Sequence, residues 1–335
     1  MLLVKNKTPL VHAVLPYTDH CDQNFVSVIV KGSFDITADG TLKLADKQEP
    51  LRETDQYTEQ PGNASLLRES DYCPIKTATD VFVLGDIVSP NEKPCLQFDA
   101  CMEIGQHHRV IRASGDRYWQ KEGLRYQASQ PQAFSRMPLI LQNAYGGSAT
   151  ENEEAAPESY AYNPVGKGFI SKNTNIEGVA LPNLESPERL ISTPEQKPLP
   201  YCPAFLNKNW LPRSQLAGNC DEQWQAQRMP LLPKDFDIRF YNAALPEFIL
   251  PMLKGGEPVN MQGFSPEGAL SFTLPNWNMK IKYCMKNEVL EARSKLDTLT
   301  ILSNKRQVII NWRACFPCAQ NFLYIKWMEI KAVYV

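Results

Sequence analysis

Alternating apolar and polar positions run through the first third of the chain and return in the last third. Strict alternation is typical of a strand with one buried face, and a short apolar run is typical of a strand buried on both faces. Segments with these patterns are 25–34, 41–44, 80–85, 96–104 and 108–115, then 268–274, 279–283, 297–302, 307–314 and 322–335. Because short turns separate them, a sandwich or barrel is favoured over alternating β and α units.

Two of the turns predict hairpins. Asp39-Gly40 follows the first strand, and this dipeptide tolerates the positive φ that tight hairpin turns need. The second hairpin is expected across residues 303–306, between the strands 297–302 and 307–314. Both pairs would be antiparallel.

The composition changes between Pro131 and Pro258. Sixteen of the 26 prolines fall in this range, and helical periodicity is nearly absent there. We therefore expect a mainly-β protein with antiparallel, sandwich-like lobes, long ordered proline-rich loops and little helix. The predicted division is an N-terminal β-rich lobe at 1–130, a proline-rich region at 131–258 packed on the lobes, and a C-terminal β-rich lobe at 259–335.

Residues 199–242 hold the strongest candidate for a binding surface. Trp210, Arg213, Trp224 and Arg228 are large rings and guanidinium forks of the kind that anchor interfaces. Disordered linkers are poor in aromatic residues, so this proline-rich run is predicted to be an ordered loop. Trp210 and Trp224 are predicted to lie near its surface as partner-binding anchors.

Asp235 and Asp237 lie two positions apart, which in an extended chain places both carboxylates on one face. Paired acids can serve general acid–base or metal chemistry. The favoured interpretation is structural: the pair forms salt bridges with Arg239 or Arg213, or caps neighbouring turns. A hydrolase acting through the two aspartates stays open as an alternative.

Charge and hydropathy narrow the classes of function. With 35 basic and 37 acidic residues, the chain lacks the excess of positive charge typical of a nucleic-acid-binding protein. No apolar run approaches the roughly 20 residues that span a bilayer. Residues 1–16 are too short and too interrupted by proline for a signal peptide, so a cytoplasmic location is expected. No cofactor, metal, nucleic-acid or membrane partner is expected.

Nine cysteines, an odd number without a framework, are predicted to be reduced. Cys315 and Cys318 form a CxxC pair, the spacing used in redox exchange or in half of a zinc site. No second pair completes a zinc set, so a structural turn is favoured over redox or metal chemistry.

A series of short motifs recurs in a recognisable order. The motifs are NKTP (6–9), VKGSF (30–34), SDYCPIK (70–76), TDV (79–81), GDRYW (115–119), NAYGG (143–147), NPVGKG (163–168), LPNLE (181–185), WLPR (210–213), LPKDFD (232–237) and NWRA (311–314). This set resembles the bacterial adaptor family, long labelled a domain of unknown function, that is encoded beside type VI secretion spike and toxin genes. The resemblance extends from about Asn6 to about Ala314.

The resemblance implies a cytoplasmic, chaperone-like adaptor without catalytic activity. Such a protein would bind a toxin effector and help to load it onto the secretion spike or spike-tip protein; the need for a co-chaperone is left open. A structural component of the secretion machine is a further alternative. From the residues themselves, the candidate partner-binding set is Trp210, Arg213, Trp224, Arg228, Asp235, Asp237 and Arg239.

Overall fold

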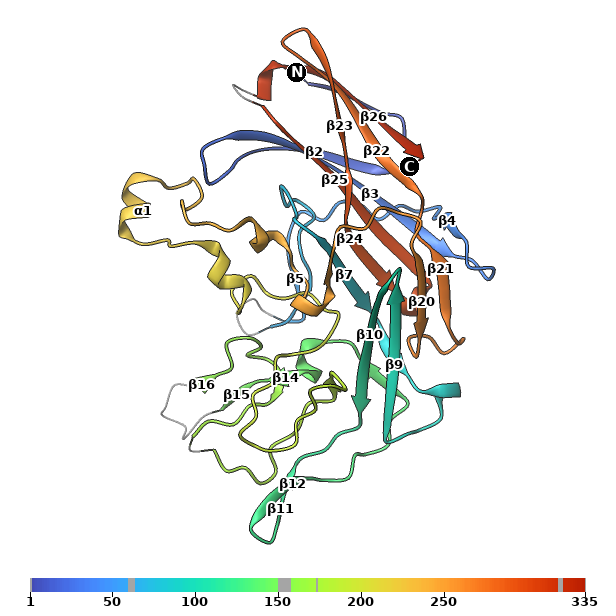
Figure 1. Ribbon diagram of the computed structural model, residues 1–335, viewed down its shortest axis with the longest axis vertical. Helices are drawn as coiled ribbons and strands as arrows, with labels where there is room; N and C mark the ends of the chain where they lie inside the picture. The colour runs from blue at the N-terminus through green and yellow to red at the C-terminus, as the bar shows by residue number, and fades with distance from the viewer. Residues whose placement is uncertain (1, 60–63, 150–157, 173, 319–321, 335) are drawn as a thin grey trace.

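The computed structural model describes residues 2–59, 64–149, 158–172, 174–318 and 322–334, and its strands form three larger sheets and several two-stranded ones (Figure 1). Within these ranges α1 (Glu222–Gln227) is the one α-helix. The predicted fold class, mainly β with antiparallel, sandwich-like sheets and little helix, is confirmed. None of the helices in the described ranges is long and apolar enough to cross a membrane.

The largest sheet has seven strands in the order β19-β7-β24-β25-β3-β2, with β4 paired to β3. Its strands are β2 (Val11–Thr18), β3 (Asn24–Ile36), β4 (Leu42–Leu44), β7 (Thr79–Leu84), β19 (Ile249–Leu250), β24 (Lys295–Leu302) and β25 (Gln307–Pro317). The predicted hairpins β3–β4 and β24–β25 are both present and antiparallel. β7 instead lies parallel to β24.

A four-stranded sheet packs on one face of this sheet and completes a sandwich. Its order is β1-β26-β22-β23, from β1 (Leu3–Asn6), β22 (Trp277–Met285), β23 (Glu288–Arg293) and β26 (Ile325–Tyr334). Trp277 of β22 stacks on Trp312 of β25 with ring centroids 5.9 Å apart, and Tyr283 stacks on Phe316 at 4.0 Å. These aromatic pairs join the two sheets through a continuous apolar core.

A five-stranded sheet has the order β18-β10-β9-β20-β21. Its strands are β9 (Gln97–Ile104), β10 (His107–Ser114), β18 (Leu184–Glu185), β20 (Pro258–Gln262) and β21 (Leu270–Thr273). Here β20 pairs with β9, and in the largest sheet β25 pairs with β3. The ranges predicted as two separate lobes, 1–130 and 259–335, therefore share sheets.

The remaining elements are short and belong mostly to the loop regions. The two-stranded sheets are β5 (Gln56–Tyr57) with β6 (Leu66–Arg68), β8 (Asp86–Val88) with β13 (Arg136–Pro138), β11 (Trp119–Glu122) with β12 (Arg125–Ala128), β14 (Tyr145–Gly146) with β17 (Lys167–Gly168), and β15 (Ser148–Ala149) with β16 (Glu158–Ser159). The 3-10 helices are η1 (Pro90–Glu92), η2 (Leu141–Asn143), η3 (Arg213–Ala217), η4 (Ile238–Tyr241), η5 (Pro246–Phe248), η6 (Ser303–Lys305) and η7 (Phe322–Tyr324).

The second face of the largest sheet carries polar side chains that are also buried. Successive residues of a strand point to opposite faces, and Val30 pairs with Trp312 just as Lys31 pairs with Asn311. Trp312 faces the sandwich core, so Lys31 and Asn311 face the segment 49–76, where both bind Asp71. Alternation in β3 and β25 therefore separates an apolar layer from a buried polar one.

The polar layer consists of ion pairs. A buried charge is energetically costly unless an opposite charge pairs with it, and pairing therefore allows these side chains to be buried. The pairs are Lys31–Glu49 (2.9 Å), Lys31–Asp71 (2.9 Å), Lys76–Asp80 (2.6 Å) and Arg313–Asp297 (2.6 Å). The motifs 30–34, 70–76, 79–81 and 311–314 supply most of these residues. Those motifs therefore stabilise the fold.

The CxxC segment does not form the predicted turn. Cys315 is the ninth residue of β25, whose pairing with β3 continues to Pro317. The Cys315 thiol lies 2.9 Å from the Tyr17 hydroxyl, while Cys318 is buried just beyond the strand. The nine cysteines all lie in the described ranges, and none of them forms a disulfide there.

Candidate functional site

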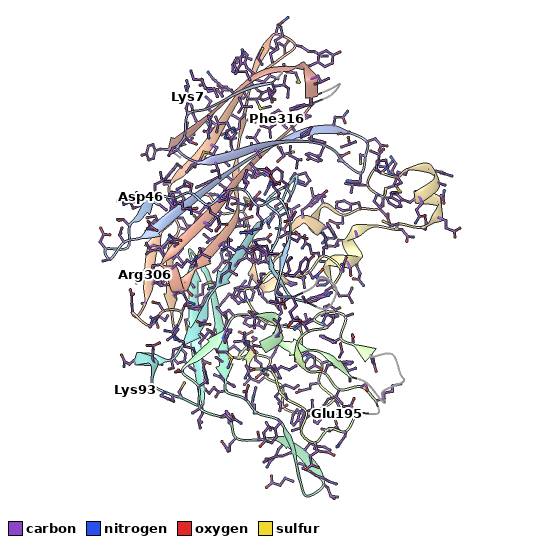
Figure 2. All side chains as sticks on the ribbon, turned by 180° about the vertical axis from the view of Figure 1, so that it is seen from behind. Lys7, Asp46, Lys93, Glu195, Arg306 and Phe316 are labelled. Carbon is purple, nitrogen blue, oxygen red and sulfur yellow. The ribbon has the colours of Figure 1, made fainter. Side chains whose placement is uncertain are left out.

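Residues 212–237, which we call the arm, stand out from the body of the protein on one side (Figure 1, Figure 2). The arm contains η3, which ends at Gly218 with a φ of 76°, and α1, which cannot extend through Pro230 and Pro233. Asp221 caps α1 by accepting a hydrogen bond from the Trp224 amide at 2.8 Å. The segment is thus ordered, as the sequence predicted, although it is mostly irregular.

Arg213 fixes the base of the arm. Its guanidinium donates to the carbonyl oxygens of Phe240 (2.7 Å) and Leu206 (2.9 Å) and forms an ion pair with Glu69. The same group lies 5.1 Å from the centre of the Phe240 ring. With 3% of its surface exposed, Arg213 holds the fold and is not accessible to a partner.

Trp210 lies just before the arm and is 5% exposed, inside the main apolar core. Its backbone amide bonds the carbonyl of Asn207, which closes a tight turn. The sequence predicted that Trp210 and Arg213 belong to an exposed binding surface. In the structure both side chains are buried, so neither is accessible to a partner.

Trp224 and its neighbours form the exposed end of the arm. The half-buried Trp224 donates its indole N–H to the Leu231 carbonyl at 2.9 Å, which closes the chain between them into a loop. Met229 and Leu231 on this loop are 64% and 38% exposed. Large apolar side chains beside an ordered tryptophan are characteristic of the centre of a protein interface.

A brace joins the arm to the tip of the β2–β3 hairpin. Arg228 pairs with Asp22 at 2.7 Å and donates to the His20 carbonyl at 2.9 Å, and Lys234 reaches Asp22 at 2.5 Å. Hydrogen bonds from Arg228 and then Lys234 lower the pKa of Asp22 to about 2. Arg228 therefore lies on the loop in which the sequence placed it. Its guanidinium contacts Asp22 and the His20 carbonyl of the same chain, whereas the sequence predicted contacts with a partner protein.

Asp235 closes the arm near its base. Its carboxylate accepts the Asn219 amide at 3.0 and 3.1 Å. Gly218 makes this closure possible: its φ is 76°, and a Cβ there would lie 2.7 Å from Pro233 Cβ and 2.8 Å from Asp235 Oδ1.

Asp237 has a separate partner. Its carboxylate accepts the Arg239 Nε at 3.0 and 2.9 Å and also caps η4 through the Arg239 amide. The hydrogen bond from Arg239 lowers the pKa of Asp237, whereas a general acid needs a raised one. The two aspartates therefore occupy the structural roles favoured from the sequence, a turn closure and a salt bridge with Arg239.

A groove of about 410 Å³ runs between α1 and the irregular segment 233–235 of the arm. It is lined by Trp224 and Arg228 on one side and by Pro233, Lys234 and Asp235 on the other. The structure thus brings together three of the predicted residues: Trp224, Arg228 and Asp235. Arg239 lies outside this groove, exposed and paired with Asp237.

One group in the described part of the chain could hold a metal ion. Asp19, His20 and Cys21 at the hairpin tip each offer a ligand atom, all within 4.8 Å of one another. Asp19 already accepts the Cys21 and Gln23 amides at 2.8 Å. The sequence prediction missed this group because no metal-binding spacing marks three consecutive residues.

The sequence prediction also missed Met229, Leu231 and Asp22. Met229 and Leu231 lie in a proline run without periodicity, so nothing in the pattern marked them as exposed. Their one signal was the presence of large apolar residues on either side of Pro230 and close to Pro233, where a buried face is hard to form. Asp22 could not be found from sequence, because its partners are more than 200 positions away.

Fold and site together define a mainly-β protein whose sandwich carries a braced, projecting arm. The chain belongs to the bacterial family described as "Uncharacterized protein conserved in bacteria" (DUF2169), whose model matches residues 22–313. No curated protein and no solved structure matches the chain.

Proposed function

We propose that this protein is a cytoplasmic adaptor that binds a toxin effector of a type VI secretion system and helps to load it onto the spike. The observation that carries this proposal is the arm, which exposes Met229 and Leu231 beside Trp224 on a support fixed by Arg213. An ordered apolar surface binds a partner without the entropic cost of ordering a loose loop. The order of motifs that resembles the adaptor family supplies the identity of the partner.

The test is an affinity pull-down of the tagged chain co-expressed with the genes that flank its own. We expect a stoichiometric complex with a toxin-like or spike protein. We also expect Met229→Asp to weaken the complex by roughly tenfold or more, because the new carboxylate would be desolvated in the interface.

The matched control is Leu124→Asp. Leu124 is fully exposed, at 100%, in the turn between β11 and β12, far from the arm in Figure 1. Equal loss of binding in both variants, or recovery of the tagged chain alone, would overturn the proposal. Recovery of the chain with the spike in the secreted fraction would favour a structural component of the machine instead.

A further inference from the structure

A second groove, of about 440 Å³, lies between β10, the loop 186–189 and η5. It shares no lining residue with the groove of the arm, and its lining includes His108, Arg109, Glu188 and Tyr201. Three independent features of this groove point to a ligand.

The first feature is a free strand edge. In the β9–β10 hairpin, residues 107, 109 and 111 exchange backbone hydrogen bonds with β9, so His108 and Val110 direct their N–H and C=O groups away from it. β18 covers only Arg112 and Ala113 on that side. Of these outward groups, the His108 carbonyl accepts Arg109 Nη1 at 2.8 Å; the others have no backbone partner in the described chain.

The second feature is Arg109, a cation without a counter-ion. Asp99 forms an ion pair with Arg112 at 2.6 Å, and Oε1 of Glu247 forms one with Arg189 at 2.5 Å, whereas Glu247 Oε2 is buried without a hydrogen-bond partner among the described residues. The Arg109 guanidinium instead donates to the backbone carbonyls of Glu247 (2.7 Å) and His108, and makes no ion pair with any described residue. Two carbonyls thus hold a guanidinium in place while one of its nitrogens, Nη2, stays available.

The third feature is the Tyr201 hydroxyl. Tyr201 is 94% buried, since 6% of its surface is exposed, and its ring packs on Phe248 with centroids 5.2 Å apart. The hydroxyl lines the groove and makes no hydrogen bond with any described residue. The hydroxyl oxygen itself is reached by solvent from the groove, so it is free to donate to a ligand.

We propose that this groove binds an extended segment of a partner protein, which adds to the free edge of β10 and places an Asp or Glu side chain against Arg109 and Tyr201. Strand addition would use the His108 N–H and both outward groups of Val110 and supply affinity, while the carboxylate would supply specificity. The guanidinium fork and the hydroxyl together offer the donors that a carboxylate needs. The proposal concerns a site separate from the arm.

The experiment titrates the ¹⁵N-labelled full chain with the acetylated, amidated peptide TVTEVTV and follows the backbone amides by NMR. We expect saturable shifts at His108 and Val110, and binding weaker by roughly tenfold for the TVTQVTV peptide. Because no neighbouring gene product is needed, this result is independent of the adaptor proposal. No saturable shift at β10, or shifts confined to the arm, would overturn the inference.

Variants separate ligand contacts from folding. Tyr201→Phe removes a hydroxyl that has no partner, so the unfolding midpoint should not fall while peptide binding weakens by roughly threefold or more. Arg109→Met should weaken binding by roughly tenfold, and Arg125→Met on exposed β12 should leave it unchanged. Equal peptide binding by the wild type and Tyr201→Phe would contradict the proposed site. So would tight binding of TVTQVTV with a free C-terminus, because the site would then recognise a terminal carboxylate and not an acidic side chain.

Discussion

Arg228 of the arm and Asp22 of the β2–β3 hairpin form an ion pair of 2.7 Å between segments about two thirds of the chain apart. Lys234 shares the same carboxylate at 2.5 Å. The pair lies at the surface, where a single salt bridge adds little to global stability. Its effect is local, because it connects a projecting segment to the rigid sandwich.

Replacing Asp22 with Asn should therefore loosen the arm without unfolding the protein. We expect faster hydrogen–deuterium exchange in residues 222–231 and an unfolding midpoint close to that of the wild type. Asp46→Asn is the control, since Asp46 is exposed and forms no ion pair among the described residues. Unchanged exchange in the Asp22 variant would show that the brace does not order the arm.

The same pair predicts a pH dependence. Arg228 and Lys234 lower the folded-state pKa of Asp22 from 3.8 to about 2, so the ordering effect is complete above pH 3.8. It is lost as the pH falls through about 2, because protonation removes the charge. The indole N–H signal of Trp224 should move over this range in the wild type, and the movement should be absent in Asp22→Asn.

Gly218 should be intolerant of a side chain. Its φ of 76° with ψ of −179° is almost exclusive to glycine, and a Cβ would crowd Pro233 and Asp235. We expect Gly218→Ala to cost about 1–3 kcal/mol in unfolding free energy. Gly123 has a φ of 60° and open space where a Cβ would lie, so Gly123→Ala measures the cost of a positive φ without crowding. Equal losses would mean that the closure of the arm is not tightly packed.

Alternation predicted the strands well, because it reports directly which residues of a strand are buried. It could not predict the neighbours of each strand: β7 lies parallel to β24, although more than 200 residues separate them, and both faces of β3 are buried. Pairing depends on long-range packing that local pattern does not contain.

The candidate site was predictable only in part. Rigid aromatic and arginine residues in a proline-rich run indicated an ordered loop, and Trp224 and Arg228 do lie on it. Trp210 and Arg213 have the same local signature yet are buried. An irregular segment has no period from which burial can be read, so the sequence could not separate the two pairs.

The two tryptophans should differ sharply when replaced by alanine. Trp210→Ala leaves a cavity in the main core and should cost about 3–5 kcal/mol. Trp224 is half-buried on the arm, so Trp224→Ala should cost about 1 kcal/mol, mainly through the lost hydrogen bond to Leu231. Urea unfolding measures both. A large loss for Trp224→Ala would make that residue part of the folding core.

The ion pair of Arg213 with Glu69 offers the most demanding test of how the arm is attached. Glu69 is 13% exposed, and burial raises its pKa despite the opposing effect of Arg213. Arg213→Met would leave this carboxylate unpaired and should cost about 3–5 kcal/mol. The double variant Arg213→Met/Glu69→Gln should cost less than the sum of the single variants, by about 0.5–3 kcal/mol.

The sign of the pH dependence follows from the raised pKa. A carboxyl group with a raised folded-state pKa binds its proton more tightly in the folded protein, so its stabilising contribution is lost as the pH rises. Without Arg213 the pKa of Glu69 rises further, so the loss in Arg213→Met should be smaller at pH 5 than at pH 8. Urea unfolding at the two pH values measures this difference. Two results together would contradict a role for Glu69: an equal loss of unfolding free energy at pH 5 and pH 8, and single-variant losses that add up to that of the double variant. Arg213 would then hold the arm through its hydrogen bonds to the Phe240 and Leu206 carbonyls.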